Sequence, residues 1–202
     1  MATPSRNNQQ TSRYTTNASS YTLAGYTPTS GSGRLLEVRV SGQRNDETNF
    51  TWGVTFGGTA MTEAVTSVNT SFGRIYRVSV FYLVSPATSA ADIVATATGG
   101  GTLIGAIIEA TTLLGVDTSS PLGATATDSD ASATTSTLAL TGCAADSLIL
   151  AAVASTSGGP PTWSWSTATE DYDLAHGSDT HNEIAGSGAY YAVTSAGNVT
   201  LT

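Results

Sequence analysis

Both histidines of the chain, His176 and His181, lie in the acid-rich segment EDYDLAHGSDTHNE, which covers residues 170–183. Imidazole and carboxylate groups can bind Zn²⁺, and oxygen ligands alone can hold Ca²⁺. The spacing matches neither an HExxH motif nor an EF-hand loop, so a flexible loop would have to arrange every ligand. The sequence therefore favours a solvated acidic loop, and it predicts no metal site and no cofactor.

Nucleophilic catalysis is not indicated either. Ser is plentiful, but no GxSxG motif occurs, and the strand–turn–helix context of a nucleophile elbow is missing. The three glycines Gly99–Gly101 lack the helix and the Lys that a phosphate-binding loop needs, so a hairpin turn explains them. A sequence does not show how far apart two carboxylates lie in the fold, so it leaves open a pair at the separation found in glycosidases. We expect a protein that is not an enzyme, without catalytic residues.

Aromatic side chains remain as candidate contacts to a partner. Trp163 and Trp165 alternate in a WSW motif and, with Tyr172, could form a platform for the apolar face of a sugar. Packing or a subunit contact is the favoured interpretation of this pair. The full set of candidate contact residues is Tyr14, Tyr21, Tyr26, Trp163 and Trp165.

Composition excludes several classes of protein. Only 11% of the 202 residues are charged, the seven cations are all Arg, and the net charge is −8. A helical bundle would use far more Glu, Lys and Leu, and a nucleic-acid binder would show a basic patch. No Arg or Lys follows Arg77, so we expect no nucleic-acid partner. The longest apolar runs, LIGAII and LILAAVA, are too short to span a bilayer, so we expect no membrane partner.

The chain divides into two parts by composition. Residues 1–33 are polar and end in the breaker run TPTSGSG, which predicts an extended N-terminal arm. Residues 34–202 contain eight to ten short apolar segments and no amphipathic helix, and they predict one β-sandwich domain. The expected fold is all-β, an antiparallel two-sheet β-sandwich, jelly-roll-like. The single Cys143 follows an apolar run and is expected to be buried.

Alternating residues predict which way each strand faces. In LLEVRV, Leu36 and its alternate neighbours would face the core, while Glu37 and Arg39 would face solvent. In the strand over residues 75–84, Val80 would face the core among Tyr76, Val78 and Tyr82. Gly57-Gly58 predicts a tight hairpin, the glycines at 99–101 predict a second one, and an Ala-Gly turn before the C-terminal strand predicts a third. Trp163 and Trp165 suggest a short edge strand.

From Leu35 onward several motifs follow one another: LLEVRVSG, TWGVTFGGTAMTEAV, RIYRVSVFYLVSPATSAADIVAT, GVDTSSPLGA and a terminal AGNVTLT. This succession resembles a group of β-sandwich proteins encoded by tailed phages and some bacteria. In that group a GG hairpin, an aromatic strand ending before Pro, and a GVD…P loop recur. The resemblance implies a virion surface or adhesion module, and it carries over no catalytic residue.

The leading hypothesis is a capsid decoration (cement) protein that binds the outer surface of a tailed-virus head and stabilises it. Its expected partners are the major capsid protein lattice and further copies of itself, as a trimer or dimer. A sandwich without an evident active site, a polar arm and an exposed type of surface without an export signal motivate this hypothesis. The alternatives are a tail or fibre module that binds host glycan through the WSW motif, and an enzyme or metal-dependent module built on the loop of His176 and His181.

Overall fold

The chain folds into antiparallel β-strands. The computed structural model describes residues 3–129, 135–155, 163–174 and 184–202, and every regular element in these ranges is a strand. The strands are β1 (Ser5–Tyr14), β2 (Ser20–Tyr26), β3 (Leu35–Arg44), β4 (Thr51–Phe56), β5 (Thr59–Ala60), β6 (Thr62–Ser71), β7 (Arg74–Val84), β8 (Ala91–Thr98), β9 (Gly105–Leu114), β10 (Leu138–Cys143), β11 (Ser147–Ser155), β12 (Thr169–Leu174), β13 (Ala185–Val193) and β14 (Gly197–Leu201). The prediction of an all-β protein is confirmed.

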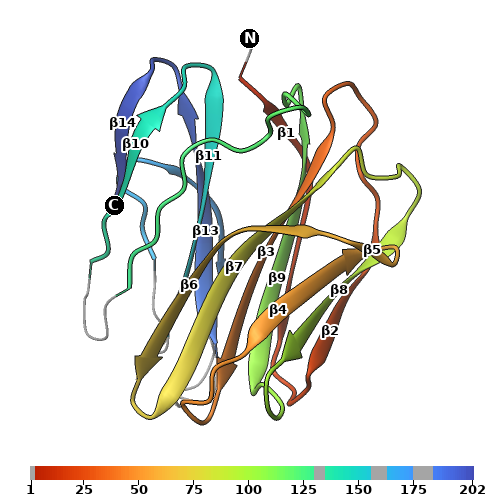
Figure 1. Cartoon of the computed structure of the whole chain (residues 1–202), viewed down its shortest axis with the longest axis vertical. Coiled ribbons are helices and arrows are strands. Elements are labelled where there is room, and N and C mark those ends of the chain that lie inside the picture. The colour runs from red at the N-terminus through yellow and green to blue at the C-terminus, as the bar shows by residue number, and fades with distance from the viewer. Residues whose placement is uncertain (1–2, 130–134, 156–162, 175–183) are drawn as a thin grey trace.

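The strands form four antiparallel sheets rather than two. A five-stranded central sheet has the order β1-β9-β3-β7-β6, and a four-stranded sheet has the order β2-β8-β4-β5. The C-terminal strands form a three-stranded sheet, β11-β13-β12, and a two-stranded sheet, β10-β14. Figure 1 shows these C-terminal strands, in cyan and blue, gathered at one side of the molecule. The arrangement is consistent with a β-sandwich to which a further pair of sheets is added.

The main core lies between the central sheet and the four-stranded sheet. Leu36, Val38 and Val40 of β3 project into it and meet aromatic side chains such as Trp52 and Phe56 of β4. Burial of this apolar surface, at about 25 cal/mol per Å², is the principal stabilising contribution to such a fold. The predicted inward face of β3 is therefore confirmed.

The opposite face of the central sheet is covered by the C-terminal strands. Ile107 of β9 packs there against Tyr172 of β12 and Ile184. On their outer side, β11 and β13 enclose a second core with β10 and β14, which includes Cys143. The expected burial of the cysteine is confirmed. The middle strands of the central sheet are thus buried on both faces: every residue of β3 is buried, and so is all of β9 but its last residue.

This double burial corrects two predictions of strand facing. Glu37 and Arg39 do not face solvent: their side chains lie between the central sheet and the C-terminal strands, at 2% and 0% exposure. In β7 it is Phe81, and not Val80 as predicted, that projects into the main core. Val80 lies half-buried on the opposite face. Period-two alternation identified the two faces, but it could not show that a further sheet covers the second one.

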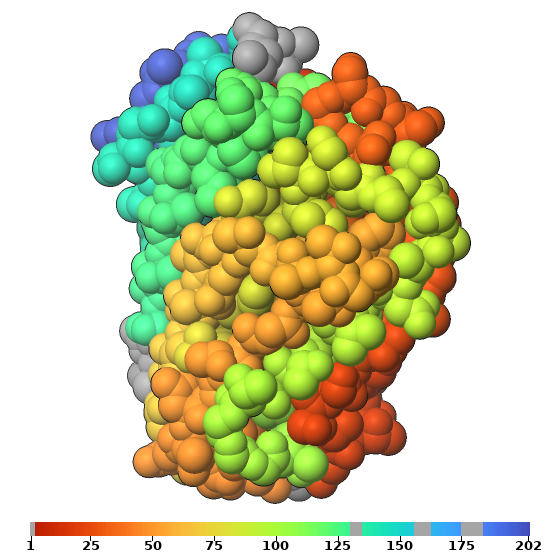
Figure 2. Space-filling view, turned by 45° about the vertical axis from the view of Figure 1, so that its right-hand side comes forward, coloured from red at the N-terminus to blue at the C-terminus, as the bar shows by residue number. Residues whose placement is uncertain are grey.

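The N-terminal residues are part of the sheets. β1 pairs with β9 at the edge of the central sheet, and β2 pairs with β8 in the four-stranded sheet. The prediction of an extended arm over residues 1–33 is therefore not confirmed. Figure 2 shows the red N-terminal residues lying flush against the rest of the surface in that view. The polar composition of β1 is that of an edge strand, which needs few apolar side chains.

The predicted turns had mixed outcomes. Gly57 and Gly58 have φ angles of 54° and 81° and join β4 to β5, which confirms the first hairpin. Gly99–Gly101 instead connect β8 to β9 across two different sheets, so the second hairpin was wrong. The third hairpin was also wrong, because β13 and β14 pair with different strands. The predicted edge strand was wrong as well, since Trp163 and Trp165 lie outside any strand.

Among the described residues, no helix could cross a membrane.

Candidate functional site

The three candidate tyrosines lie inside the fold. Tyr21 and Tyr26 are 3% and 0% exposed and belong to the main core. Tyr14 is partly buried, and its hydroxyl donates a hydrogen bond of 2.6 Å to the carbonyl oxygen of Thr22. The hydroxyls of Tyr26 and Thr112 lie 2.9 Å apart. The structure therefore does not support these tyrosines as partner contacts, because their rings already fill internal space.

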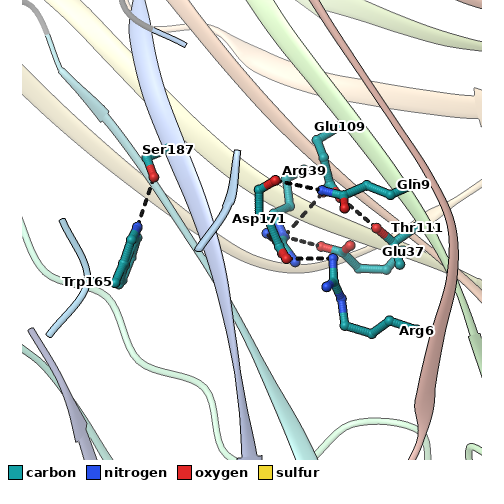
Figure 3. Close-up of polar contacts among 9 residues, drawn as sticks. All are labelled: Arg6, Gln9, Glu37, Arg39, Glu109, Thr111, Trp165, Asp171 and Ser187. Atoms are coloured by element: carbon teal, nitrogen blue, oxygen red, sulfur yellow. Dashed lines mark hydrogen bonds and ion pairs between the residues drawn. The ribbon is translucent and has the colours of Figure 1, made fainter. Parts of the chain in front are cut away.

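The two tryptophans are half-buried and have different surroundings. Trp165 packs against the second core, which β10, β11, β13 and β14 enclose. Its indole N–H donates a 2.8 Å hydrogen bond to the hydroxyl of Ser187 on β13 (Figure 3). The backbone N–H of Trp163 donates to a carboxylate oxygen of Asp173 at 3.3 Å. Tyr172 is buried beneath β13, so the three aromatic rings do not share one platform.

A groove lies between the central sheet and the C-terminal strands. Its volume is about 420 Å³, and Val65, Val78 and Val80 of β6 and β7 line one side. Leu150 of β11 and the indole of Trp163 line the other side. Polar residues such as Ser67, Asp128 and Ser136 also line the groove, which is large enough to accept a ring-shaped or branched group with both apolar and polar faces.

The predicted acidic loop lies largely outside the described residues, because His176 and His181 fall in the range 175–183. In the part of the chain that the structure describes, no three His, Cys, Asp or Glu side chains are arranged so that they could hold a metal ion. Asp171, at the start of this segment, is not available as a free ligand. Its carboxylate is engaged with two arginines in the interior.

These contacts belong to a buried ionic cluster, which we define as Arg6, Glu37, Arg39, Glu109 and Asp171 (Figure 3). Arg39 is at its centre. Its Nε lies 2.8 Å from Oε1 of Glu37 and 3.4 Å from Oε2 of Glu109, and its Nη1 lies 2.8 Å from Oδ2 of Asp171. The cluster connects the neighbouring strands β3 and β9 to β12 of the facing sheet.

Two β-bulges turn the side chains of Arg6 and Asp171, the outer residues of the ionic cluster, toward each other. In β1 the pairing register shifts between Asn7 and Gln9, with Asn8 at a φ of 43°, which brings Arg6 to the covered face of the sheet. In β12 the register shifts between Glu170 and Tyr172, which leaves Asp171 as the extra residue. Bulges commonly re-aim a side chain in this way. As a result, Nη2 of Arg6 lies 2.7 Å from Oδ1 of Asp171.

Glycines on β13 allow this close approach. A Cβ atom at Gly188 would lie only 2.5 Å from Nη1 of Arg39 and would overlap the ring of Tyr172. A Cβ atom at Gly186 would lie 2.8 Å from the carbonyl oxygen of Val153 on β11 and 3.1 Å from Cδ1 of Ile107 on the central sheet. A larger residue at either position would push β13 away from the central sheet and open the cluster to water.

Burial changes the protonation of the cluster. Desolvation raises the pKa of Glu37 to about 8, and the neighbouring carboxylates add to the rise against the opposing effect of Arg39. Desolvation also raises the pKa of Glu109, although Arg39 and the hydroxyl of Thr111 oppose it. Three carboxylates face two guanidinium groups, so retention of one proton would balance the charge. The phenol of Tyr172 has a raised pKa for the same reason, burial.

The ionic cluster is closed to solvent, since four of its side chains are no more than 2% exposed. Its geometry holds four strands, β1, β3, β9 and β12, in one arrangement, and it presents no group to an external substrate. The sequence patterns did not predict this cluster. The signal was present, because Glu37, Arg39 and Glu109 each interrupt an otherwise apolar run, and such charges are either solvated or paired.

Comparisons with known proteins found no match to a family model, to a curated protein or to a solved structure.

Proposed function

We propose that the protein is a structural component of a virus particle, without enzymatic activity, that binds the outer surface of a tailed-virus head and stabilises it. The observation that carries the proposal is the strand order. Apart from the edge strand β6, the central sheet (β1-β9-β3-β7) and the sheet β2-β8-β4-β5 have four strands each, which supports a jelly roll, in which eight strands form two sheets. Viral capsid proteins and lectins both use this fold.

Charge supports an outward-facing position. The net charge of −8 would repel packaged nucleic acid, which itself carries a dense negative charge. The expected location is therefore the exterior of the capsid, with the major capsid protein lattice as the partner. Because residues 5–26 contribute strands to the sheets, the folded surface rather than an arm makes this contact in our proposal.

Stabilisation would come from several weak contacts acting together. A dimer or trimer at a local symmetry axis of the shell meets several identical capsid subunits at once. Each further contact then forms within an existing complex, at high effective concentration. A protein that binds the assembled lattice and not the free subunits must raise the resistance of the shell to disassembly.

The test compares particles with and without the protein in a thermal release assay at low and high salt. We expect genome release at a higher temperature when the protein is bound. The effect should depend little on salt, because few cations are available for ion pairs across the interface. Equal release temperatures with normal occupancy of the particle would overturn the proposal.

A second candidate function is recognition of a host glycan by a tail or fibre module. The groove favours it, because the ring of Trp163 lines one wall and lectins also use jelly rolls. In the same particles, impaired adsorption to host cells after Trp163→Ala, with unchanged thermal release, would support this alternative. Quantitative mass spectrometry would also separate the two, since a head protein occurs in many more copies than a tail protein.

A further inference from the structure

The groove between the central sheet and the C-terminal strands combines two kinds of lining. Val65 and Val78 contribute apolar surface from β6 and β7. Hydroxyl-bearing residues make up much of the rest, and they include Ser67, Ser136 and Ser164. A sugar ring has matching surfaces, since its C–H groups form an apolar face and its hydroxyls lie around the edge. Apolar walls with a few polar groups are also the usual lining of a small-molecule site.

Trp163 provides a flat surface and an unused donor in this groove. Its ring is half-buried and lines the side opposite the valines. The indole N–H is buried and has no hydrogen-bond partner in the part of the chain that the structure describes. A buried donor without a partner is unfavourable, and a hydroxyl oxygen of a bound sugar would satisfy it. The same indole can cover the apolar face of a sugar ring.

The charge of the groove restricts which sugars it can hold. Among the described residues that line it there is no Arg, Lys or His, and Asp128 has the one charged side chain. Oδ2 of Asp128 accepts hydrogen bonds from the hydroxyl of Ser136 at 2.7 Å and from the backbone N–H of Thr137 at 3.3 Å. These bonds lower the pKa of Asp128, so its carboxylate is ionised at neutral pH. A second carboxylate, that of Asp173, contacts the backbone N–H of Trp163.

We infer that the groove binds uncharged sugars and rejects sugars that carry a carboxylate or sulfate group. This inference rests on the glycan-binding candidate under the proposed function and adds the chemical class of the glycan. An anionic sugar would place its charge near Asp128, with no cation in the described lining to offset it. Repulsion between like charges is a common means of rejecting a wrong ligand. A neutral sugar requires only apolar contact and hydrogen bonds, and the groove offers both.

The experiment applies the purified full-length chain to an array of neutral oligosaccharides of glucose, galactose, mannose and N-acetylglucosamine. Each neutral sugar stands beside a counterpart that carries a uronic acid, sialic acid or sulfate group. Pairs with a binding member are then titrated by tryptophan fluorescence. At low salt we expect the neutral member to bind at least about tenfold more tightly than its anionic counterpart. The difference should shrink as salt screens the repulsion.

Variants of the groove assign the binding to it. Trp163→Ala should abolish sugar binding, and so should Ala152→Phe, which fills the groove from β11 and serves if the first variant does not fold. Asp128→Asn should narrow the difference within a pair, because the anionic member then meets less repulsion. Leu122→Ser is the matched control. Leu122 is exposed and does not line the groove, so sugar binding should be unchanged.

The outcomes distinguish this inference from the proposals on which it depends. Anionic sugars that bind as tightly as neutral ones, an unchanged difference in Asp128→Asn, or binding that survives both groove variants would overturn the inference and leave glycan recognition standing. An array on which no sugar binds would overturn the glycan-binding candidate as well. None of these results bears on stabilisation of the capsid, which the thermal release assay tests.

Discussion

The guanidinium of Arg6 lies 2.7 Å from the carboxylate of Asp171, so the first strand of the chain is joined to one of the last. Asp171 also accepts a 2.8 Å hydrogen bond from Arg39 in the centre of the molecule. One carboxylate thus holds β1, β3 and β12 together. Buried ion pairs of this kind add little net stability when complete, but breaking one leaves an uncompensated charge in the interior.

Replacement of this carboxylate should therefore be costly. We expect Asp171→Asn to lower the free energy of unfolding by about 3–5 kcal/mol, because Nη2 of Arg6 and Nη1 of Arg39 each lose the carboxylate oxygen that they contact in the interior. The matched control is Asp173→Asn, two residues away and exposed, which should change stability by about 0.5 kcal/mol or less. Denaturation in urea measures both. Equal losses for the two variants would contradict the assigned role of Asp171.

Stability should fall as the pH rises from mild acid to mild alkali. The pKa of Glu37 is raised from 4.5 to about 8, and that of Glu109 is raised as well, so the folded protein binds these protons more tightly than the unfolded chain. Their stabilising contribution is complete below pH 4.5 and is lost as the pH rises through the folded pKa. For Glu37 alone the slope is at most about 1.4 kcal/mol per pH unit.

The isosteric variant Glu37→Gln provides the control for this pH dependence. Its amide resembles the protonated carboxyl group and cannot ionise, so the slope between pH 4.5 and 8 should become flatter. Exposed Asp46, Asp117 and Asp128 have lowered pKa values, chiefly through hydrogen bonds, and their contributions should still be lost below about pH 4. An unchanged slope in the variant would show that Glu37 does not retain a proton in the folded state.

Two glycine substitutions should have opposite effects. Gly188→Ala places a methyl group against Arg39 and Tyr172, so we expect a loss of at least about 1–3 kcal/mol from overpacking. At Gly53 of β4, the nearest atom to an added Cβ is 4.0 Å away, and φ is not positive. Gly53→Ala should therefore be neutral or gain about 0.4–1 kcal/mol. Thermal unfolding of both variants tests whether β13 must approach so closely.

Neighbouring residues of β7 should differ sharply. Phe81 fills the main core, and Phe81→Ala should cost about 3–5 kcal/mol. Val80 lies half-buried beside the groove, and Val80→Ala should cost about 1 kcal/mol or less. If Val80→Ala lowered the free energy of unfolding by more than Phe81→Ala, Val80 and not Phe81 would face the main core, as the alternation of residues in β7 predicted.

Apolar alternation predicted several strands of both cores well. The segments that became β3, β4, β7, β8 and β11 all carry recognisable β-branched or aromatic patterns, and burial confirmed the apolar face of β3. The polar strands β1 and β12 could not be found in this way. Their residues are held by pairing and by ionic contacts, and neither leaves a hydrophobic period in the sequence.

The ionic cluster could be predicted only in part. Glu37 and Arg39 are two residues apart on one face of a strand, which identifies them as neighbours. Their partner Asp171 comes from a distant segment, and a bulge turns its side chain inward. Local sequence patterns specify neither the pairing of distant strands nor the sheet that finally covers a polar face, so solvent exposure was the natural but incorrect expectation.

The charged face of the central sheet also has a consequence for synthesis on the ribosome. Strands β1 to β9 are translated before any of the C-terminal strands that cover this face. A nascent chain folds from its N-terminal end, so this face meets water while the later strands are still being made. Val78, Val80 and Ile107 lie on the same face, so Val or Leu in place of the three charged residues would give the unfinished protein a larger apolar surface that is prone to aggregation. The charged side chains of Glu37, Arg39 and Glu109 bind water at that surface until β12 and β13 have been synthesised. In the completed molecule the same side chains form the ionic contacts that join the central sheet to β12.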